Sequence, residues 1–271
     1  MNTTLLIVIG IIAGVGLFLW LGTKLMPKPF KSYPEESPEL QTISLTKGLP
    51  TPVERFYRQV YGEEIPIIHS FILTGRGSLR FKNVTLPARL RFVHDAGKGY
   101  RHYIETTMWG IPLMRVNEHY LDWKSRLALP FGVVEGEPQV DQAANLGMWS
   151  ETMAFPGVYI STSGVRWEEV DEEEARLIVP FKDDEDEFNV HFNPETGLID
   201  KMVTLRWKNP GEEKKTRWEA QAREWGKVRG WQMPVLFAAQ WMDEETPWLI
   251  ARIEDVAWNV DVSEYIQGKG I

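Results

Sequence analysis

Cysteine is absent from the 271 residues of this sequence, and histidine is scarce. Without cysteine, structural disulfides, thiol nucleophiles and thiolate metal sites are all excluded. The five histidines are His69, His94, His102, His119 and His191, and none shows the HxH or HExxH spacing of a local metal site. His102 and His119 could approach each other across neighbouring strands, but we expect that no metal is bound.

Basic residues are outnumbered by acidic ones: 30 Lys and Arg stand against 38 Asp and Glu, a formal net charge of −8. A nucleic-acid surface needs clustered Lys and Arg, so we expect no nucleic-acid partner. The acidic run from Asp183 to Glu187 lacks the glycine and spacing of a calcium-binding loop and is typical of a solvated hairpin turn. No glycine-rich phosphate loop and no Gly-x-Ser-x-Gly motif is present, and we predict no cofactor.

Three carboxylates, Glu137, Asp141 and Glu151, could form a cluster for acid/base chemistry. The decisive pair is Asp141 and Glu151. They are ten residues apart in a stretch typical of a helix, which separates them by roughly 15 Å along the helix axis. Paired catalytic carboxylates share a site, and these two are too far apart to share a proton. Asp141 instead falls in the first helical turn, where it would stabilise the helix dipole. These residues therefore do not assign a reaction, and an enzyme that uses Asp141 or Glu151 stays open as a separate hypothesis.

A long apolar run lies at the amino terminus, from Leu5 to Gly22. As a helix it would be roughly 27 Å long, close to the thickness of the hydrocarbon core of a bilayer. A cleaved signal peptide would need basic residues before the run and small residues at a cleavage site. No basic side chain precedes Leu5, and residues 25–28 (LMPK) make a poor cleavage site. We therefore predict that residues 1–24 form an uncleaved transmembrane anchor.

The side of the membrane is less clearly marked. Lys24, Lys28 and Lys31 follow the apolar run, which by the positive-inside rule favours a cytoplasmic domain. Glutamates follow soon afterwards, so the membrane face stays open. Residues 25–50 contain five prolines and are expected to form a semi-extended linker that holds the domain off the membrane. The domain itself is predicted to span residues 51–271, beginning with a helix capped by Thr51 and Glu54.

Two runs of period-two alternation, from Ile67 to Val134 and from Val165 to Val260, predict strands joined by short turns. Such a series forms an antiparallel meander. Between the runs, residues 138–155 have helical spacing, with Pro138 at the start and Pro156 after the end. The predicted fold is therefore mainly β: a curved antiparallel meander or half-barrel, with one covering helix and an N-terminal transmembrane helix. Small residues on that helix would allow close approach to the concave face of the sheet.

Several motifs occur in a characteristic order along the chain. They are residues 137–142 (EPQVDQ), 151–156 (ETMAFP), 165–168 (VRWE), 192–197 (FNPETG), Trp218 with 223–226 (REWG), and 256–262 (VAWNVDV). This order resembles an uncharacterised bacterial family with a domain of unknown function, of the 6544/6920 type, over about residues 71–265. Met153 and Ala154 depart from the bulky pair expected there. The layout is similar to lipoprotein carriers of the LolA type, an analogy of fold that does not transmit function.

A curved sheet under a helix offers a concave, mostly apolar site, the usual form of a small-molecule pocket. We expect a membrane-anchored domain that binds an apolar ligand, such as a membrane lipid or acyl chain, with the helix closing the mouth. The candidate ligand-binding residues are Trp109, Met148, Trp149, Met153 and Phe155 as lining, with Arg115, Gln142 and Glu151 orienting a head group. Two alternatives stay open. These residues could be ordinary core, or the twelve tryptophans could mark a structural or assembly module that contacts a membrane-protein complex.

Overall fold

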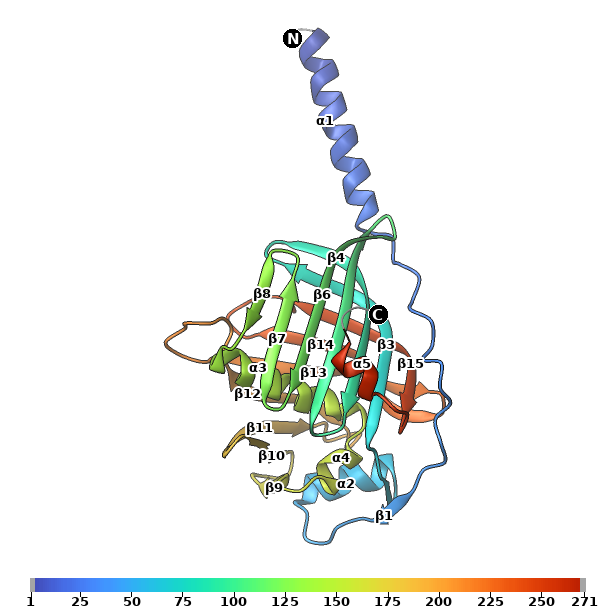
Figure 1. Ribbon diagram of the computed structural model, residues 1–271, viewed down its shortest axis with the longest axis vertical. Helices are drawn as coiled ribbons and strands as arrows, with labels where there is room; N and C mark the ends of the chain where they lie inside the picture. The colour runs from blue at the N-terminus through green and yellow to red at the C-terminus, as the bar shows by residue number, and fades with distance from the viewer. Residues whose placement is uncertain (1–2, 269–271) are drawn as a thin grey trace.

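The alternating runs of the sequence form one antiparallel sheet in the computed structural model, which describes residues 3–268 (Figure 1). Within these residues the sheet has 13 strands, in the order β8-β7-β6-β5-β4-β3-β15-β14-β13-β12-β11-β10-β9. The first run supplies β3 (Ser70–Phe81), β4 (Val84–Asp95), β5 (Gly99–Met108), β6 (Ile111–Leu121), β7 (Lys124–Leu129) and β8 (Gly132–Glu135). The second supplies β9 (Arg166–Glu169), β10 (Glu174–Phe181), β11 (Asp184–Phe192), β12 (Ile199–Arg206), β13 (Thr216–Val228), β14 (Trp231–Trp241) and β15 (Leu249–Trp258). The predicted antiparallel β fold is confirmed.

The two meanders meet at one seam, where β3 pairs with β15. Glycine makes this close approach possible, because a Cβ on Gly77 would lie 1.8 Å from the carbonyl oxygen of Ile250. Gly75 is similarly tight, with 2.1 Å to the carbonyl oxygen of Arg252. The first strand of one run and the last strand of the other therefore lie in the middle of the sheet.

The helix between the runs lies in the hollow of the sheet, as the predicted fold required. Helix α3 (Pro138–Glu151) contacts β6 and β7 in one arm and β10 and β12 in the other, which are far apart in strand order. The sheet must therefore curl around the helix (Figure 1). The chain continues as a 3₁₀ turn, η1 (Thr152–Ala154), and a short helix, α4 (Gly157–Ser161), so helical structure resumes after Pro156.

Helix α2 (Thr51–Val60) begins one residue earlier than its sequence signal implied. Pro50 occupies the cap position and no side chain caps the helix, so the predicted capping box at Thr51 is wrong. Glu54 instead pairs with Arg58, one turn further along the helix, at 2.7 Å. Beside α2, the short strands β1 (Thr42–Ser44) and β2 (Glu64–Pro66) form a separate two-stranded ribbon.

The proline-rich segment does not project as a free spacer. Residues 25–38, which we call the strap, run along the outer face of the sheet (Figure 1). The Arg76 guanidinium donates a hydrogen bond of 3.0 Å to the carbonyl of Pro27, and the Tyr33 hydroxyl donates one of 3.1 Å to the carbonyl of Asp261. Tyr33 also packs on a small outer cluster beneath α5 (Ser263–Gln267), a helix that the sequence pattern did not indicate.

Helix α1 (Thr3–Gly22) protrudes from one end of the domain (Figure 1). Among the described residues it alone is long and apolar enough to cross a membrane, a test that a signal sequence would also pass. Its base rests on the β5–β6 turn. The Trp109 amide donates to the carbonyl of Gly22 at 3.0 Å, and the rings of Phe18 and Trp109 lie 4.7 Å apart. The helix therefore joins the domain at the tip of one hairpin.

Candidate functional site

A cavity of about 410 Å³ lies inside the curve of the sheet. Its walls are the inner faces of the first meander and of β13 to β15, and α3 forms one side. The helix contributes Val140, Ala143, Ala144 and Gly147, whose small side chains leave space where larger ones would fill it. Ligand pockets are typically about 300–1,000 Å³, so this volume suits one small or chain-like molecule.

The lining is mainly apolar. Leu73, Phe92, Ile104, Val116, Leu249 and Ile253 come from the strands, with Trp218 and Trp248 among the aromatic side chains. The exposed lining residues are Phe81, Asn209 and Pro210, so the mouth lies between the β3–β4 turn and the β12–β13 loop. Helix α3 forms one wall of the cavity, and the side chain of Gln139 in its first turn bonds to the β12–β13 loop beside the mouth.

One end of the cavity is polar. Tyr100, His102, Glu118, Glu151 and Arg206 line it, and we call these residues the polar end. The Tyr100 hydroxyl donates a hydrogen bond of 2.6 Å to Glu118 Oε1. The Arg206 guanidinium lies over the ring of Trp218, 4.6 Å from its centroid, and its Nε is buried without a hydrogen-bond partner. A charged group thus faces the cavity with part of its donor capacity unused.

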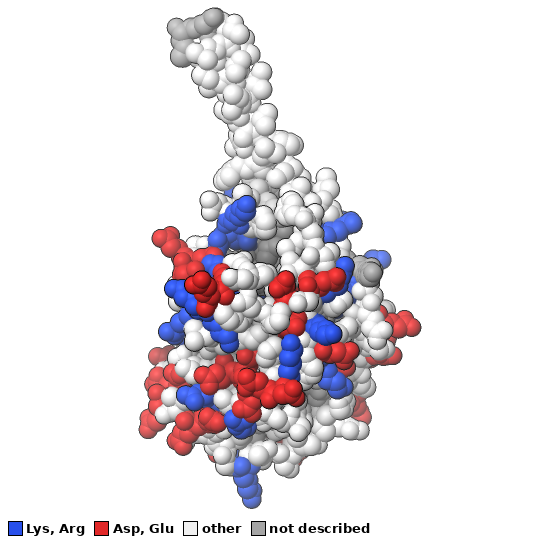
Figure 2. Space-filling view, turned by 60° about the vertical axis from the view of Figure 1, so that its left-hand side comes forward, with Lys and Arg blue, Asp and Glu red and all other residues white. Residues whose placement is uncertain are grey.

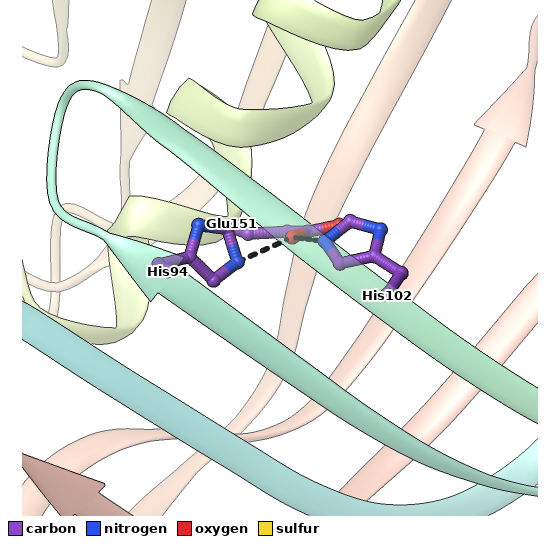
Figure 3. A group of neighbouring side chains, drawn as sticks. All are labelled: His94, His102 and Glu151. Atoms are coloured by element: carbon purple, nitrogen blue, oxygen red, sulfur yellow. Dashed lines mark ion pairs between the residues drawn. The ribbon is translucent and has the colours of Figure 1, made fainter. Parts of the chain in front are cut away.

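Glu151 lies at the carboxyl end of α3 and meets two histidines of the sheet (Figure 3). His94 Nε2 is 2.9 Å and His102 Nε2 is 2.7 Å from Glu151 Oε2. The register of β4 and β5 explains this: Tyr100 is opposite His94 and Phe92 is opposite His102, so both histidines point to the inner face as diagonal neighbours. The end of the helix places the carboxylate between them.

Burial controls the ionisation of these three side chains. Removal from water lowers the pKa of His94, and it lowers the pKa of His102 to about 4. Burial raises the pKa of Glu151, although contact with His94 opposes that change. Both imidazoles are therefore neutral at pH 7. Burial also lowers the pKa of Arg206, opposed by the charge of Glu118.

Only Glu151 among the eight candidate ligand-binding residues lines the cavity. Met148, Trp149, Met153 and Phe155 are fully buried parts of the core. Phe155 stacks on Phe71 at 4.9 Å, and the carbonyl of Trp149 accepts a hydrogen bond from Tyr159. These four side chains belong to the hydrophobic core that packs around the end of α3, outside the cavity.

The other three candidates lie away from the cavity. Trp109 is at the base of α1, and Arg115 Nε is 3.3 Å from Glu105 Oε1 on the outer face. Gln142 donates to Asp186 Oδ1 at 2.7 Å, which ties α3 to β11. Asp141, placed at the helix start, also accepts hydrogen bonds from the amide and hydroxyl of Ser125.

His102 and His119 lie on neighbouring strands, as the sequence suggested, but on opposite faces of the sheet. Glu118 is opposite His102 in the register of β5 and β6, whereas His119 is opposite Arg101 and so belongs to the other face. The sequence does contain a signal that His94 lies near His102, because the turn after Asp95 places residues 94 and 102 on one face of a hairpin. Nothing local in the sequence indicates that Glu151, some fifty residues later, would join them.

No curated protein matches the chain. Among solved structures, the chain is similar to a LolA superfamily protein, NE2245 from Nitrosomonas europaea, with a TM-score of 0.47 and 8% identity over 80% of this chain and 96% of that one. It is also similar to a DUF1329 family protein from Desulfovibrio piger, with a TM-score of 0.42 and 10% identity over 78% and 91% of the two chains. Residues 39–253 match the profile of a family of unknown function, DUF6544, and the chain belongs to that family.

Proposed function

We propose that this protein is a membrane-anchored domain that binds one lipid or acyl chain inside its curved sheet. The observation that carries this proposal is the cavity of about 410 Å³ with its mainly apolar lining. Protein interiors are close-packed, and voids larger than a water molecule are few. A volume of this size within a well-packed β domain is therefore best explained as the place of a ligand.

The polar end defines the class of ligand further. An amphipathic molecule would place its apolar body against Phe92, Ile104 and Leu249 and its head group beside Arg206. The unpartnered Nε of Arg206 is a donor suited to a carboxylate or phosphate oxygen. A buried donor without a partner is costly, and an anionic head group would relieve that cost.

An apolar rim supports a position for the domain next to a membrane. The turns β3–β4, β5–β6 and β7–β8 share the end of the sheet that carries α1, and they expose Phe81, Val84, Ile111, Leu113, Phe131 and Val133. We call these residues the rim. Figure 2 shows uncharged surface continuing from α1 onto the adjoining end of the domain, with acidic and basic side chains spread over the rest of this face. If α1 spans a bilayer, the rim rests on its surface, and Phe81 belongs to both the rim and the mouth of the cavity.

The experiment combines extraction and binding. Full-length protein purified in mild detergent is expected to yield lipid on extraction with organic solvent, and to bind a fluorescent fatty acid. Ala143→Phe, which fills the cavity from α3, should weaken probe binding at least about tenfold. Ala128→Phe is the matched control, because Ala128 does not line the cavity although its neighbours Leu127 and Leu129 do. Recovery of no lipid, together with equal probe binding by the two variants, would contradict the proposal.

An assembly role is the alternative that the rim favours, because exposed apolar surface also marks protein contacts. Pulldown in detergent followed by mass spectrometry separates the two functions. A stoichiometric membrane-protein partner with an empty cavity would favour assembly. The lysines after α1 favour a cytoplasmic domain, and protease accessibility in intact cells against spheroplasts tests that side.

A further inference from the structure

We propose that His94, His102 and Glu151 bind one divalent transition-metal ion, with an open coordination position that faces the cavity. The proposal goes beyond lipid binding and does not rest on it. Among the described residues, these three form the group of histidine and acidic side chains whose ligand atoms lie within 4.8 Å of one another. Figure 3 shows the two imidazoles on either side of the carboxylate.

Glu151 Oε2 lies slightly closer to each Nε2 than two ligands of one zinc ion, which are about 3.3 Å apart for metal–ligand distances of about 2.0–2.1 Å, so a small outward shift would let the three atoms share an ion. The distances from Glu151 Oε2 to the two histidine Nε2 atoms, 2.7 and 2.9 Å, are short enough for hydrogen bonds. Yet both Nε2 atoms and Oε2 are buried without a hydrogen bond of acceptable geometry. Buried polar atoms are nearly always satisfied, and each exception calls for a cause. One cation would satisfy all three atoms.

The two rings are held in place by aromatic stacking. His94 stacks on Phe71 with centroids 4.3 Å apart, and His102 stacks on Tyr100 at 3.9 Å. The Nε2 atom of each ring is directed at the Glu151 carboxylate, which is the side on which an ion would lie. The rings therefore need little rearrangement to act as ligands.

The local charge also suits a cation. Two carboxylates, Glu118 and Glu151, belong to the polar end, against the single guanidinium of Arg206. The side chain of Glu151 is 21% exposed, and that exposure faces the cavity that it lines. An ion bound here would therefore have three protein ligands and one side open to the cavity.

The ligand set selects the class of ion. Two imidazoles and one carboxylate with an open position are typical of zinc sites that bind an exchangeable fourth ligand, and of iron(II) sites. Calcium and magnesium prefer oxygen ligands and are poorly matched. Zinc and cobalt are accordingly the probes we would use.

Metal content of the full-length protein in detergent tests the site. After treatment with a chelator and equilibration with Zn²⁺, we expect one zinc per chain to survive gel filtration, as counted by elemental mass spectrometry. Co²⁺ in its place should give the intense visible absorption of a four- or five-coordinate ion. His94→Ala, His102→Ala and Glu151→Gln should each weaken zinc binding at least about 100-fold, since loss of supporting groups alone costs about 10–100-fold.

The matched control is His191→Ala. His191 Nδ1 lies 3.3 Å from Glu174 Oε2, a histidine–carboxylate contact outside the cavity, and this variant should keep the zinc. Failure of the wild type to retain zinc, or equal zinc retention by Glu151→Gln, would overturn the proposal. If the alanine variants do not fold, as judged by circular dichroism, the cobalt spectrum of the wild type decides alone, because the spectrum of free aqueous Co²⁺ would exclude the site. Lipid extraction is a separate readout, so failure of either proposal leaves the other testable.

Discussion

Desolvation at the polar end determines how individual side chains titrate. His102 and Glu151 are in contact, yet burial moves their pKa values in opposite directions, downward for the imidazole and upward for the carboxyl. Relative to the unfolded chain, burial thus shifts each group toward its neutral form. Such groups change stability with pH in opposite senses, and each can be followed by substitution of one residue.

His102 should make the domain sensitive to acid. Its pKa is about 4 when folded against 6.5 for the free side chain, so the unfolded chain binds more protons between these pH values. The stability that His102 contributes is complete above pH 6.5 and is lost as the pH falls toward 4, by about 3 kcal/mol. Urea unfolding of residues 25–271 with chelator present, at pH 7 and pH 4.5, should show this loss. His102→Gln should reduce it, and the exposed His69→Gln should not.

At the scale of elements, the structure depends on one seam and one helix. The β3–β15 seam joins the two meanders, and α3 fixes the distance between their arms. Asn145 is the central residue of the contact between α3 and the two arms. Its amide donates to Asp186 Oδ2 at 2.9 Å and to the carbonyl of Pro180 at 3.1 Å, while its oxygen accepts from Tyr120 at 3.2 Å. One buried side chain thus connects α3 to both arms.

Gly77→Ala should weaken the seam, because the added methyl group would collide with the backbone at Ile250. Forcing extra volume into a packed site costs about 1–3 kcal/mol. The thermal midpoint should therefore fall by roughly 5 °C. Ser78→Ala, at the next position of β3, is the control and should leave the midpoint nearly unchanged. Equal midpoints for the two variants would mean that the seam tolerates a side chain.

Asn145→Leu should release α3 from the arms while preserving its volume. Asp186 and Tyr120 would lose a buried partner, and each unsatisfied group costs about 1–3 kcal/mol. Chemical denaturation followed by tryptophan fluorescence would measure the loss. Ser150→Ala is the comparison, because the Ser150 hydroxyl bonds only to the carbonyl of Gly147 in its own helix. A similar small change in both would show that Asn145 does not connect the arms.

Much of this arrangement could be predicted from period and turn signals. Alternate residues of a strand share a face, so the period-two run that includes residues 100–108 places His102 and Ile104 together, and both line the cavity. The pairing of β3 with β15 could not be predicted, because strands separated by some 170 residues leave no local signal of their contact. For the same reason Arg206 was missed: its place beside Glu151 exists only when the second meander closes over the first.

The whole molecule carries its amino-terminal segment on its surface. The strap lies outside the part that matches the family, yet it covers the outer cluster through Tyr33 and binds Arg76. The strap is therefore part of the packed domain, in contrast to the expectation of a spacer. Helix α1 beyond it is almost wholly exposed within the domain's own structure.

Two truncations separate the roles of α1 and the strap. Removal of residues 1–24 should leave the thermal midpoint within about 2 °C, because α1 contacts the domain chiefly at its base. Removal of residues 1–38 should lower it by roughly 5 °C or more, since the outer cluster and the guanidinium of Arg76 lose their cover. Circular dichroism melts of both forms measure this. Identical melts would mean that the strap adds nothing to stability.

The β3–β15 seam has a consequence for biosynthesis. Its two strands are synthesised some 170 residues apart, so the middle of the sheet stays unpaired until residues 249–258 leave the ribosome. Contacts between residues that are distant in sequence make folding slow, and strand edges that have not yet found their partner are prone to aggregate. By then an inserted α1 would already hold the nascent chain at the bilayer. The domain would then complete its fold at the membrane surface, next to the lipids that we propose it binds.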